Sequence, residues 1–307
     1  MSNAKANGSA SNHKLKAQIS MHSMMIPAMI FAVIFALFPL VGLVMAFQDY
    51  SPTKGFLRSQ FVDIYNFTKL FNRSDFGDAL VNTVVIAFAK IVAVTILSIV
   101  IALLINEIQS KTLKKIIQTT IFLPYFLSWA LIGNVFVEMF SQTGTVNYYL
   151  SFLGIEGEYW ITSNTWFRVI IVATDVWKTL GYQVVVFLAA ITSINSNLYE
   201  AAEIDGAGHW QKCRFITVPG IKPMITLMCI LNIGNIMNAG FEQILVMYNP
   251  SVYQTGDILD TMGYRIGLLG LDYSMGTAIG LFKSVISCIC FIIAYRIAFK
   301  VADYKLF

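Results

Sequence analysis

The chain has 307 residues, of which 57% are hydrophobic and only 12% are charged. Its mean hydropathy is +0.67, and a soluble fold could not cover that much apolar surface with so few charges, so a lipid bilayer must be part of its solvent. The formal net charge of +4 is accounted for by basic loops beside a membrane and indicates no nucleic-acid partner.

The first 20 residues are polar and rich in Ser, Asn and Lys, which predicts a flexible N-terminal tail. A hydrocarbon core about 30 Å thick needs roughly 20 apolar helical residues for one crossing. Six segments satisfy this, and they predict an all-α polytopic membrane protein with one transmembrane domain over residues 21–307. The segments are 23–47, 79–105, 116–140, 166–192, 222–248 and 275–301.

The loops between these segments differ in charge. Six crossings place both termini on one side, and the loops of that side carry basic residues, among them Lys111, Lys114, Lys212 and Arg214. The 141–165 loop on the other side has no Lys or Arg, although the 49–78 loop has four. The positive-inside rule therefore predicts that both termini are cytoplasmic.

Polar side chains inside the fourth and fifth segments are expected to meet at similar depth. At about 1.5 Å per residue, Asp175 to Tyr182 lie roughly 14–24 Å from the outer end of the fourth segment, and the asparagines of the fifth lie about 15–24 Å from the opposite side. Polar groups at this depth usually face a bundle interior or a wet cavity, which predicts a translocation cavity. Candidate substrate-binding residues are Asp175, Trp177, Lys178, Thr179, Tyr182, Asn235 and Asn238.

These residue types suit a sugar, because Trp177 and Tyr182 offer flat apolar faces and the others offer hydrogen bonds to hydroxyls. An Asp–Lys pair in the cavity would further suit an acidic or amino sugar. The alternative is that Asp175 and Lys178, at positions i and i+3, neutralise each other and that the asparagines only hold helices together. Lys90 and Lys283 are expected to pair with acidic side chains, whereas Glu242 is either a gate or an exposed edge.

The polar loop 193–222 contains Glu200-Ala201-Ala202, then Gly206, then Ile216-x-Val218-Pro219. This pattern predicts a short helix, a glycine turn and a second short helix ended by the proline. Small alanines permit close approach of a partner, Glu200 can pair with a cation across an interface, and Gly206 allows a sharp turn. We therefore interpret the loop as a protein-docking element, with a structural interhelical loop or a DNA-binding helix pair as alternatives.

Motifs for chemistry are missing from the sequence. It has no G-x-x-x-x-G-K-[ST] phosphate loop, no H-E-x-x-H, and no His or Cys spacing typical of a metal site. We predict no catalytic residue, no metal and no cofactor on this chain, so that any ATP and Mg²⁺ would be bound by a separate ATPase subunit.

The docking loop resembles the cytoplasmic loop of permease subunits of binding-protein-dependent, ATP-driven (ABC) importers, with Val218 in place of their usual leucine. Longer runs resemble maltose-type carbohydrate permeases and a subgroup of them associated with complex oligosaccharides. The first set is Asp175–Tyr182, Ser193–Gly208 and Val218–Pro223; the second is Phe47–Gly55, Leu104–Glu107 and Phe122–Tyr125.

The resemblance implies a type I importer permease in a bacterial cytoplasmic membrane, which works with a second permease subunit, an ATPase dimer and an extracytoplasmic binding protein. It places Trp177, Tyr182, Asn235 and Asn238 on helices that line the sugar site. It also makes Glu200 to Gly206 the coupling helix, and an oligosaccharide would pass by alternating access. The alternatives are a secondary transporter or channel, or a permease of the same class for an amino acid or metal.

Overall fold

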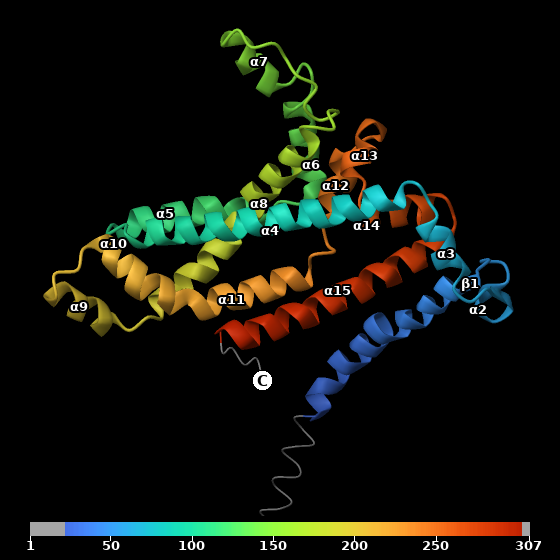
Figure 1. Ribbon diagram of the computed structural model, residues 1–307, viewed down its shortest axis with the longest axis horizontal. Coiled ribbons are helices and arrows are strands. Elements are labelled where there is room, and N and C mark those ends of the chain that lie inside the picture. The colour runs from blue at the N-terminus through green and yellow to red at the C-terminus, as the bar shows by residue number, and fades with distance from the viewer. Residues whose placement is uncertain (1–21, 303–307) are drawn as a thin grey trace, which may run out of the picture.

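The structure, a computed structural model, describes residues 22–302, with side chains described as far as residue 297. The predicted tail at residues 1–20 lies outside this range. Within it the chain is mostly helical, with two two-residue strands, β1 (Gln48–Asp49) and β2 (Gln60–Phe61), paired antiparallel. The long helices form an elongated bundle, with α9 at one end and α2, α3 and the strands at the other (Figure 1).

The helices differ widely in length. The long ones are α4 (Phe76–Asn106), α8 (Phe167–Thr192), α11 (Val218–Gly234) and α15 (Tyr273–Ala302). The shorter ones are α2 (Gly55–Arg58), α3 (Tyr65–Phe71), α5 (Lys111–Phe122), α6 (Trp129–Met139), α7 (Thr145–Phe152), α9 (Ser196–Ile204), α10 (His209–Lys212), α12 (Phe241–Met247), α13 (Tyr253–Gly256) and α14 (Leu259–Gly263). Turns of 3-10 or π-helix are η1 (Val33–Leu37), η2 (Phe38–Phe47), η3 (Leu123–Phe126), η4 (Cys213–Thr217), η5 (Pro250–Val252) and η6 (Tyr264–Leu269).

Five helical runs among the described residues are long and apolar enough to cross a membrane: His22–Phe47, Phe76–Asn106, Phe167–Thr192, His209–Gly234 and Tyr273–Ile297. The predicted third segment corresponds to two helices, Lys111–Phe126 and Trp129–Met139, which meet at 97°. The helix ends there because Leu127 and Ser128 adopt extended backbone and Pro124 cannot donate a backbone hydrogen bond. The predicted third segment, 116–140, is therefore a bent pair of helices, and the described residues give six spans if this pair counts as one.

The predicted fifth segment also differs from the structure. Its helical run begins at His209, within the predicted 193–222 loop. The second short helix of that loop was predicted to end at Pro219, but it continues through the proline. The π-turn η4 permits this, because Val218 donates to the carbonyl of Cys213, five residues earlier, which widens the helix just before the proline. The run then ends at Gly234, and residues 235–240 separate it from α12.

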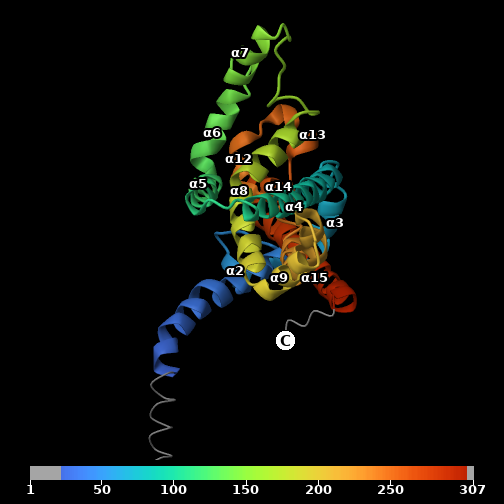
Figure 2. The same ribbon diagram turned by 90° about the vertical axis from the view of Figure 1, so that its left-hand side faces the viewer.

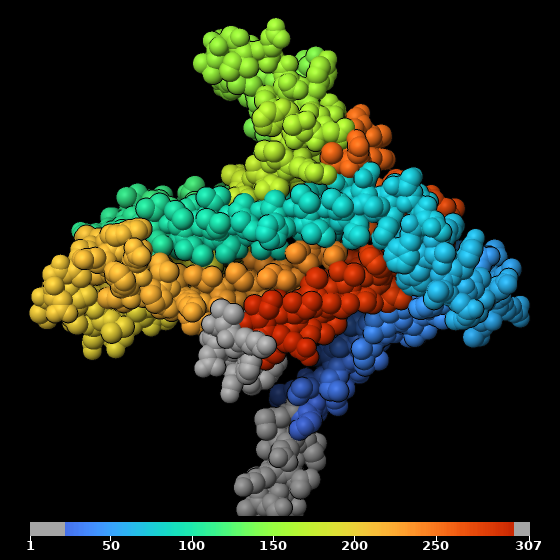
Figure 3. All heavy atoms as spheres, viewed as in Figure 1, coloured from blue at the N-terminus to red at the C-terminus, as the bar shows by residue number. Residues whose placement is uncertain are grey.

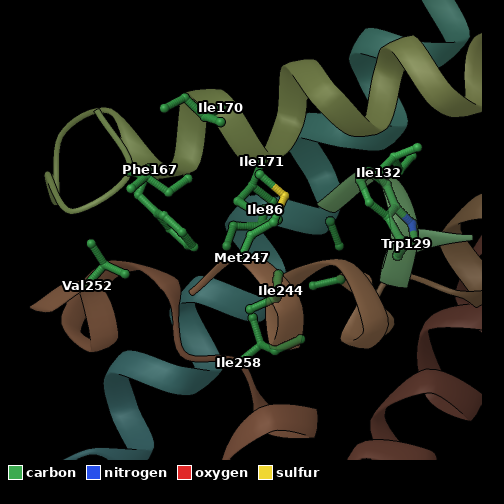
Figure 4. Close-up of a cluster of buried hydrophobic side chains, with 13 residues drawn as sticks. Ile86, Trp129, Ile132, Phe167, Ile170, Ile171, Ile244, Met247, Val252 and Ile258 are labelled. Carbon is green, nitrogen blue, oxygen red and sulfur yellow. The ribbon is translucent and has the colours of Figure 1, made fainter. Parts of the chain in front are cut away.

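Three clusters of buried apolar side chains hold the bundle together. One lies where α4, α6, α8 and α12 meet, with Ile86, Ile171 and Met247 near its centre (Figure 4). A second joins α3, α4, α14 and α15, and a third joins the far ends of α4 and α8 to α11. Gly181 of α8 lies so close to α5 that a Cβ there would be 2.1 Å from the Ile121 carbonyl oxygen, so only glycine permits this approach.

The N-terminal run His22–Phe47 is the least covered of the five candidate spans. Only 6% of its most apolar window is buried, and it diverges from the bundle in both ribbon views (Figures 1 and 2). Elsewhere α11 lies between α4 and α15 across one face of the molecule (Figure 3).

A group of charged side chains lies at the end of the bundle opposite α9. Arg73 makes two hydrogen bonds of 2.9 Å to Asp75, and this contact lowers the pKa of the Asp75 carboxyl and raises that of the guanidinium. Arg265 pairs with both Asp75 and Asp257. Burial raises the pKa of Asp257, while hydrogen bonds from Thr261 and Arg265 oppose that shift.

Candidate functional site

A cavity of about 270 Å³ lies between α4, α8 and residues 235–240, the non-helical segment after α11 that we call the break. One wall is the α8 stripe Asp175, Thr179 and Gln183, whose spacing of four residues places all three on one face of the helix. The other lining residues are Ala87, Lys90, Ile91 and Val94 of α4, with Asn232, Asn235, Asn238, Ala239 and Gly240. The α4 wall is apolar except for Lys90, so the cavity presents one apolar and one polar side.

Lys90, on α4, connects the break after α11 to α4 and α8. Its Nζ lies 3.3 Å from Oδ1 of Asp175, and it donates to the Ala239 carbonyl at 2.7 Å and to Oε1 of Gln243. Gly240 has a φ of 96°, and a Cβ there would be 2.7 Å from Nζ. The break thus has a backbone conformation that favours glycine and leaves room for the lysine head group.

Gln243 extends this contact into α8. Its Nε2 donates to the Ile171 carbonyl and to the Thr174 hydroxyl, both at 2.8 Å. Through Ala239 and Gln243, this buried hydrogen-bond network of α4, α8 and α12 holds the irregular backbone at 235–240 against the two long helices. The expectation that Lys90 and Lys283 pair with acidic side chains is confirmed, since Lys283 makes two short hydrogen bonds to Asp260.

The structure divides the predicted substrate residues into two groups. Asp175, Thr179, Asn235 and Asn238 line the cavity, whereas Trp177, Lys178 and Tyr182 are not among its lining residues. Asp175 pairs with Lys90 and not with Lys178, so the alternative of a neutral i, i+3 pair on α8 is wrong.

The three residues outside the cavity have contacts of their own. Trp177 is 47% exposed and packs edge-on against Phe136, and Tyr182 is 43% exposed and stacks on Tyr125 at 5.1 Å. Lys178 donates to the Tyr125 carbonyl at 3.1 Å. A role for these residues in substrate binding stays a prediction.

Two amide side chains of the cavity wall were not among the predicted substrate-binding residues. Gln183 and Asn232 line the cavity, and Oε1 of the first and Nδ2 of the second are buried. The signal for Gln183 was available, because it lies eight residues after Asp175 on the same helical face. Asn232 lies on the helix that leads into the break and three residues before Asn235.

A second cavity of about 750 Å³ borders the first, and Asn238 lines both. It lies between the end of the N-terminal helical run, α14, η6 and α15, and the Asp260–Lys283 pair is in its wall.

Glu242 lies in the first turn of α12 and is exposed.

The predicted docking element forms a nine-residue helix, α9, at one end of the molecule. The Asn195 side chain accepts a hydrogen bond from the amide of Asn197 and caps its start. At its end Gly206 has a φ of 76°, and Ala207 donates back to the Ala202 carbonyl at 2.8 Å, which is a typical glycine-terminated helix end. Glu200 and Ala201 are exposed, so this face of α9 is accessible.

Polar contacts hold α9 against the neighbouring segments. Tyr199 and Thr217 share a hydrogen bond of 2.9 Å, and Lys212 donates to Glu203 at 2.6 Å and lowers the pKa of that carboxyl. His209 lies 2.9 Å from Glu107, which follows α4. Large apolar side chains nearby are nevertheless exposed, namely Leu198, Ile204, Trp210 and Phe215.

Exposed apolar side chains beside an accessible short helix are typical of a protein-interaction surface.

Among the described residues, no group of three or more His, Cys, Asp or Glu side chains is arranged to hold a metal ion.

Comparison with known proteins matches the chain to one family of membrane transport components and to relatives along most of its length. The profile of the family described as binding-protein-dependent transport system inner membrane component matches residues 94–303. The chain is 34% identical over 291 residues to the polygalacturonan/rhamnogalacturonan transport system permease protein YteP of Bacillus subtilis, covering 94% of this chain and 91% of that protein. It is 36% identical over 294 residues to Protein LplB of the same organism, covering 95% and 92% of the two chains.

Solved structures agree with these relatives. A chain of a bacterial ABC transporter involved in import of the acidic polysaccharide alginate superimposes with a TM-score of 0.87 at 34% identity, over 94% of this chain and 98% of that one. A chain from the alginate transporter in complex with its pentasaccharide-bound periplasmic protein gives a TM-score of 0.88 at 34% identity, over 96% and 99%.

Proposed function

The chain belongs to the family of binding-protein-dependent transport system inner membrane components, and from that premise we propose that it passes an oligosaccharide from an extracytoplasmic binding protein to the cytoplasm. It has the type I permease fold and is the membrane permease subunit of an ATP-driven sugar importer. The chain is not itself an enzyme, because ATP hydrolysis belongs to a separate subunit in this family.

The observation that carries the substrate proposal is the two-sided cavity at the break after α11. Ala87, Ile91 and Val94 make one side apolar, and the α8 stripe and the asparagines make the other polar. A sugar unit has the same two-sided character, with C–H groups on its ring faces and hydroxyls at its edges. A volume of about 270 Å³ is near the lower end of the roughly 300–1,000 Å³ usual for ligand pockets, so this chain would enclose one unit of an oligosaccharide at a time.

The relatives support a carbohydrate over an amino acid or a metal. YteP is described as transporting polygalacturonan and rhamnogalacturonan, and AraP of Halalkalibacterium halodurans, which is 29% identical over 288 residues, as transporting arabinooligosaccharides. The solved relatives concern alginate. All of these substrates are chains of sugars, which is the class that we assign to this permease.

We assign α9 to the interface with an ATPase dimer, which would bind the ATP and Mg²⁺. The exposed Glu200 and Ala201 would enter a cleft of the ATPase, with the nearby exposed apolar side chains around them. The helical run His209–Gly234 starts beside α9 and ends at the cavity, a length of about 39 Å at 1.5 Å per residue. A movement of α9 would thereby reach Asn232 and Asn235, as alternating access requires.

The remaining partners follow from surfaces that this chain leaves uncovered. The exposed N-terminal run His22–Phe47 would pack against a second permease subunit within the bilayer. The basic loops next to α5 and α9 lie at the same end of the molecule, because Glu107 contacts His209. If this end is cytoplasmic, as the basic charges indicate, the N-terminal run enters the bilayer from the cytoplasm. Both termini would accordingly be cytoplasmic.

The test is purification of the importer complex from its native membrane, followed by reconstitution into vesicles. We expect an ATPase subunit, a second permease and a binding protein to copurify or to bind. We also expect one or more labelled oligosaccharides to enter the vesicles in an ATP-dependent way. Repeated recovery of this chain alone, or ATP-dependent uptake of amino acids but of no sugar, would contradict the proposal.

A further inference from the structure

We propose that Gln183 and Asn232 form a hydroxyl-binding pair that selects the sugar unit inside the cavity, a step that rests on the oligosaccharide function proposed above. Both residues line the cavity, the first from α8 and the second from α11. Oε1 of Gln183 and Nδ2 of Asn232 are buried, and neither has a hydrogen-bond partner among the residues that the structure describes. The Gln183 residue as a whole is only 8% exposed.

Three other polar side chains of the same wall, those of Lys90, Thr179 and Asn235, are already engaged by the protein. Lys90 is bound by Ala239, Gln243 and Asp175; the Thr179 hydroxyl donates to the Asp175 carbonyl at 2.8 Å; and the Asn235 amide donates to the Leu231 carbonyl at 3.0 Å. Buried polar atoms in native proteins are nearly always hydrogen-bonded, so each exception requires a reason. Two exceptions in one cavity, one from each facing helix, point to a partner that comes from outside this chain.

The chemistry of the two atoms defines that partner. The Gln183 oxygen accepts a hydrogen bond, and the Asn232 nitrogen donates one. A hydroxyl does both, whereas an ionised carboxylate can only accept and an ammonium group can only donate. The pair therefore suits one hydroxyl, or two neighbouring hydroxyls, of a sugar ring.

The position of the pair gives it a place in the transport path. Gln183 lies eight residues after Asp175 on one face of α8, which is about 12 Å toward the α9 end of the helix. Asp175, held by Lys90, is at the level of the break. A sugar that leaves the Asp175 level for the cytoplasm would next meet the Gln183–Asn232 pair.

The test compares Gln183→Met and Asn232→Leu, both near-isosteric and apolar, with Asn134→Leu as a matched control. Asn134 lies exposed on α6 and does not line the cavity. Each variant is assayed as the full importer in vesicles with its binding protein. Sugar uptake per ATP hydrolysed is measured for a panel of labelled neutral and uronate-containing di- and trisaccharides, together with the thermal stability of the complex.

The loss of one neutral hydrogen bond corresponds to roughly a three- to tenfold loss of affinity. We therefore expect uptake of the preferred sugar per ATP to fall about three- to tenfold in both cavity variants, with unchanged or higher thermal stability. The control should match the wild type. Stability should not fall, because an unpaired buried polar group is replaced by an apolar one.

Two results would overturn the inference. Wild-type uptake per ATP in both cavity variants would mean that water alone satisfies the two groups. A parallel loss of stability and uptake would mean that the residues serve packing. Failure of the oligosaccharide function has a different signature, since the wild-type complex itself would then transport no sugar of the panel.

Discussion

Replacement of Lys90 by methionine tests whether the buried network holds the break after α11. The variant would remove the ion pair with Asp175 and the hydrogen bonds to the Ala239 carbonyl and Gln243. The side chains of Lys90 and Asp175 are only 8% and 16% exposed, and removal of one partner of a buried pair costs about 3–5 kcal/mol. Because Asp175 faces a cavity that water can enter, we expect the lower end, about 3 kcal/mol.

The assay is equilibrium unfolding of the purified importer in mixed detergent micelles, with two further variants. The double variant Lys90→Met, Asp175→Asn should recover most of the loss, because it leaves no unpaired buried charge. Lys283→Met serves as a matched control, since the Lys283–Asp260 pair is 21% exposed on both sides and its loss should cost less. A Lys90→Met penalty below about 1 kcal/mol, or one no larger than that of Lys283→Met, would refute the reasoning.

Three further predictions follow from local geometry. Gly181→Ala should destabilise the complex by about 1–3 kcal/mol, because the added Cβ would clash with the α5 backbone. A Cβ at Gly77 would meet nothing within 4 Å, so the control Gly77→Ala should be tolerated. Equal midpoints of the two variants in equilibrium unfolding would contradict this. Gly206→Pro should assemble normally but lose sugar-stimulated ATP hydrolysis, because a φ of 76° is closed to proline; normal stimulation would exclude α9 as the coupling helix. Arg73→Gln should reduce stability at pH 7 by under about 1 kcal/mol. In the fold the pKa of Asp75 lies below its ordinary value of 3.8. The stability that the Arg73–Asp75 pair contributes is therefore complete above pH 3.8 and is lost as the pH falls through the folded pKa. A destabilisation by Arg73→Gln that grows in acid would contradict this prediction.

The membrane class, the approximate spans, and the short helix and glycine turn of the 193–222 loop could be predicted from sequence because they depend on local properties. Apolar length decides whether a helix can cross a bilayer. The spacing from Glu200 to Gly206 is contained within α9 and its turn, and the i, i+4 relation of Asp175 and Thr179 follows from helical geometry alone. None of these features requires knowledge of which helices are neighbours.

The cavity itself was decided by tertiary contacts. Lys90 and the Ala239 carbonyl are separated by 149 positions in the chain, so no local pattern could reveal that a lysine of α4 holds the break after α11. Residues 222–248 are apolar enough on average to predict one continuous span in spite of their asparagines, and this average does not locate the end of the helix at Gly234. The faces of α8 were likewise undetermined, because a membrane helix can present aromatic residues to lipid or to a cavity. Only the packing of α4, α8 and α11 placed Gln183 in the cavity wall and Trp177 outside it.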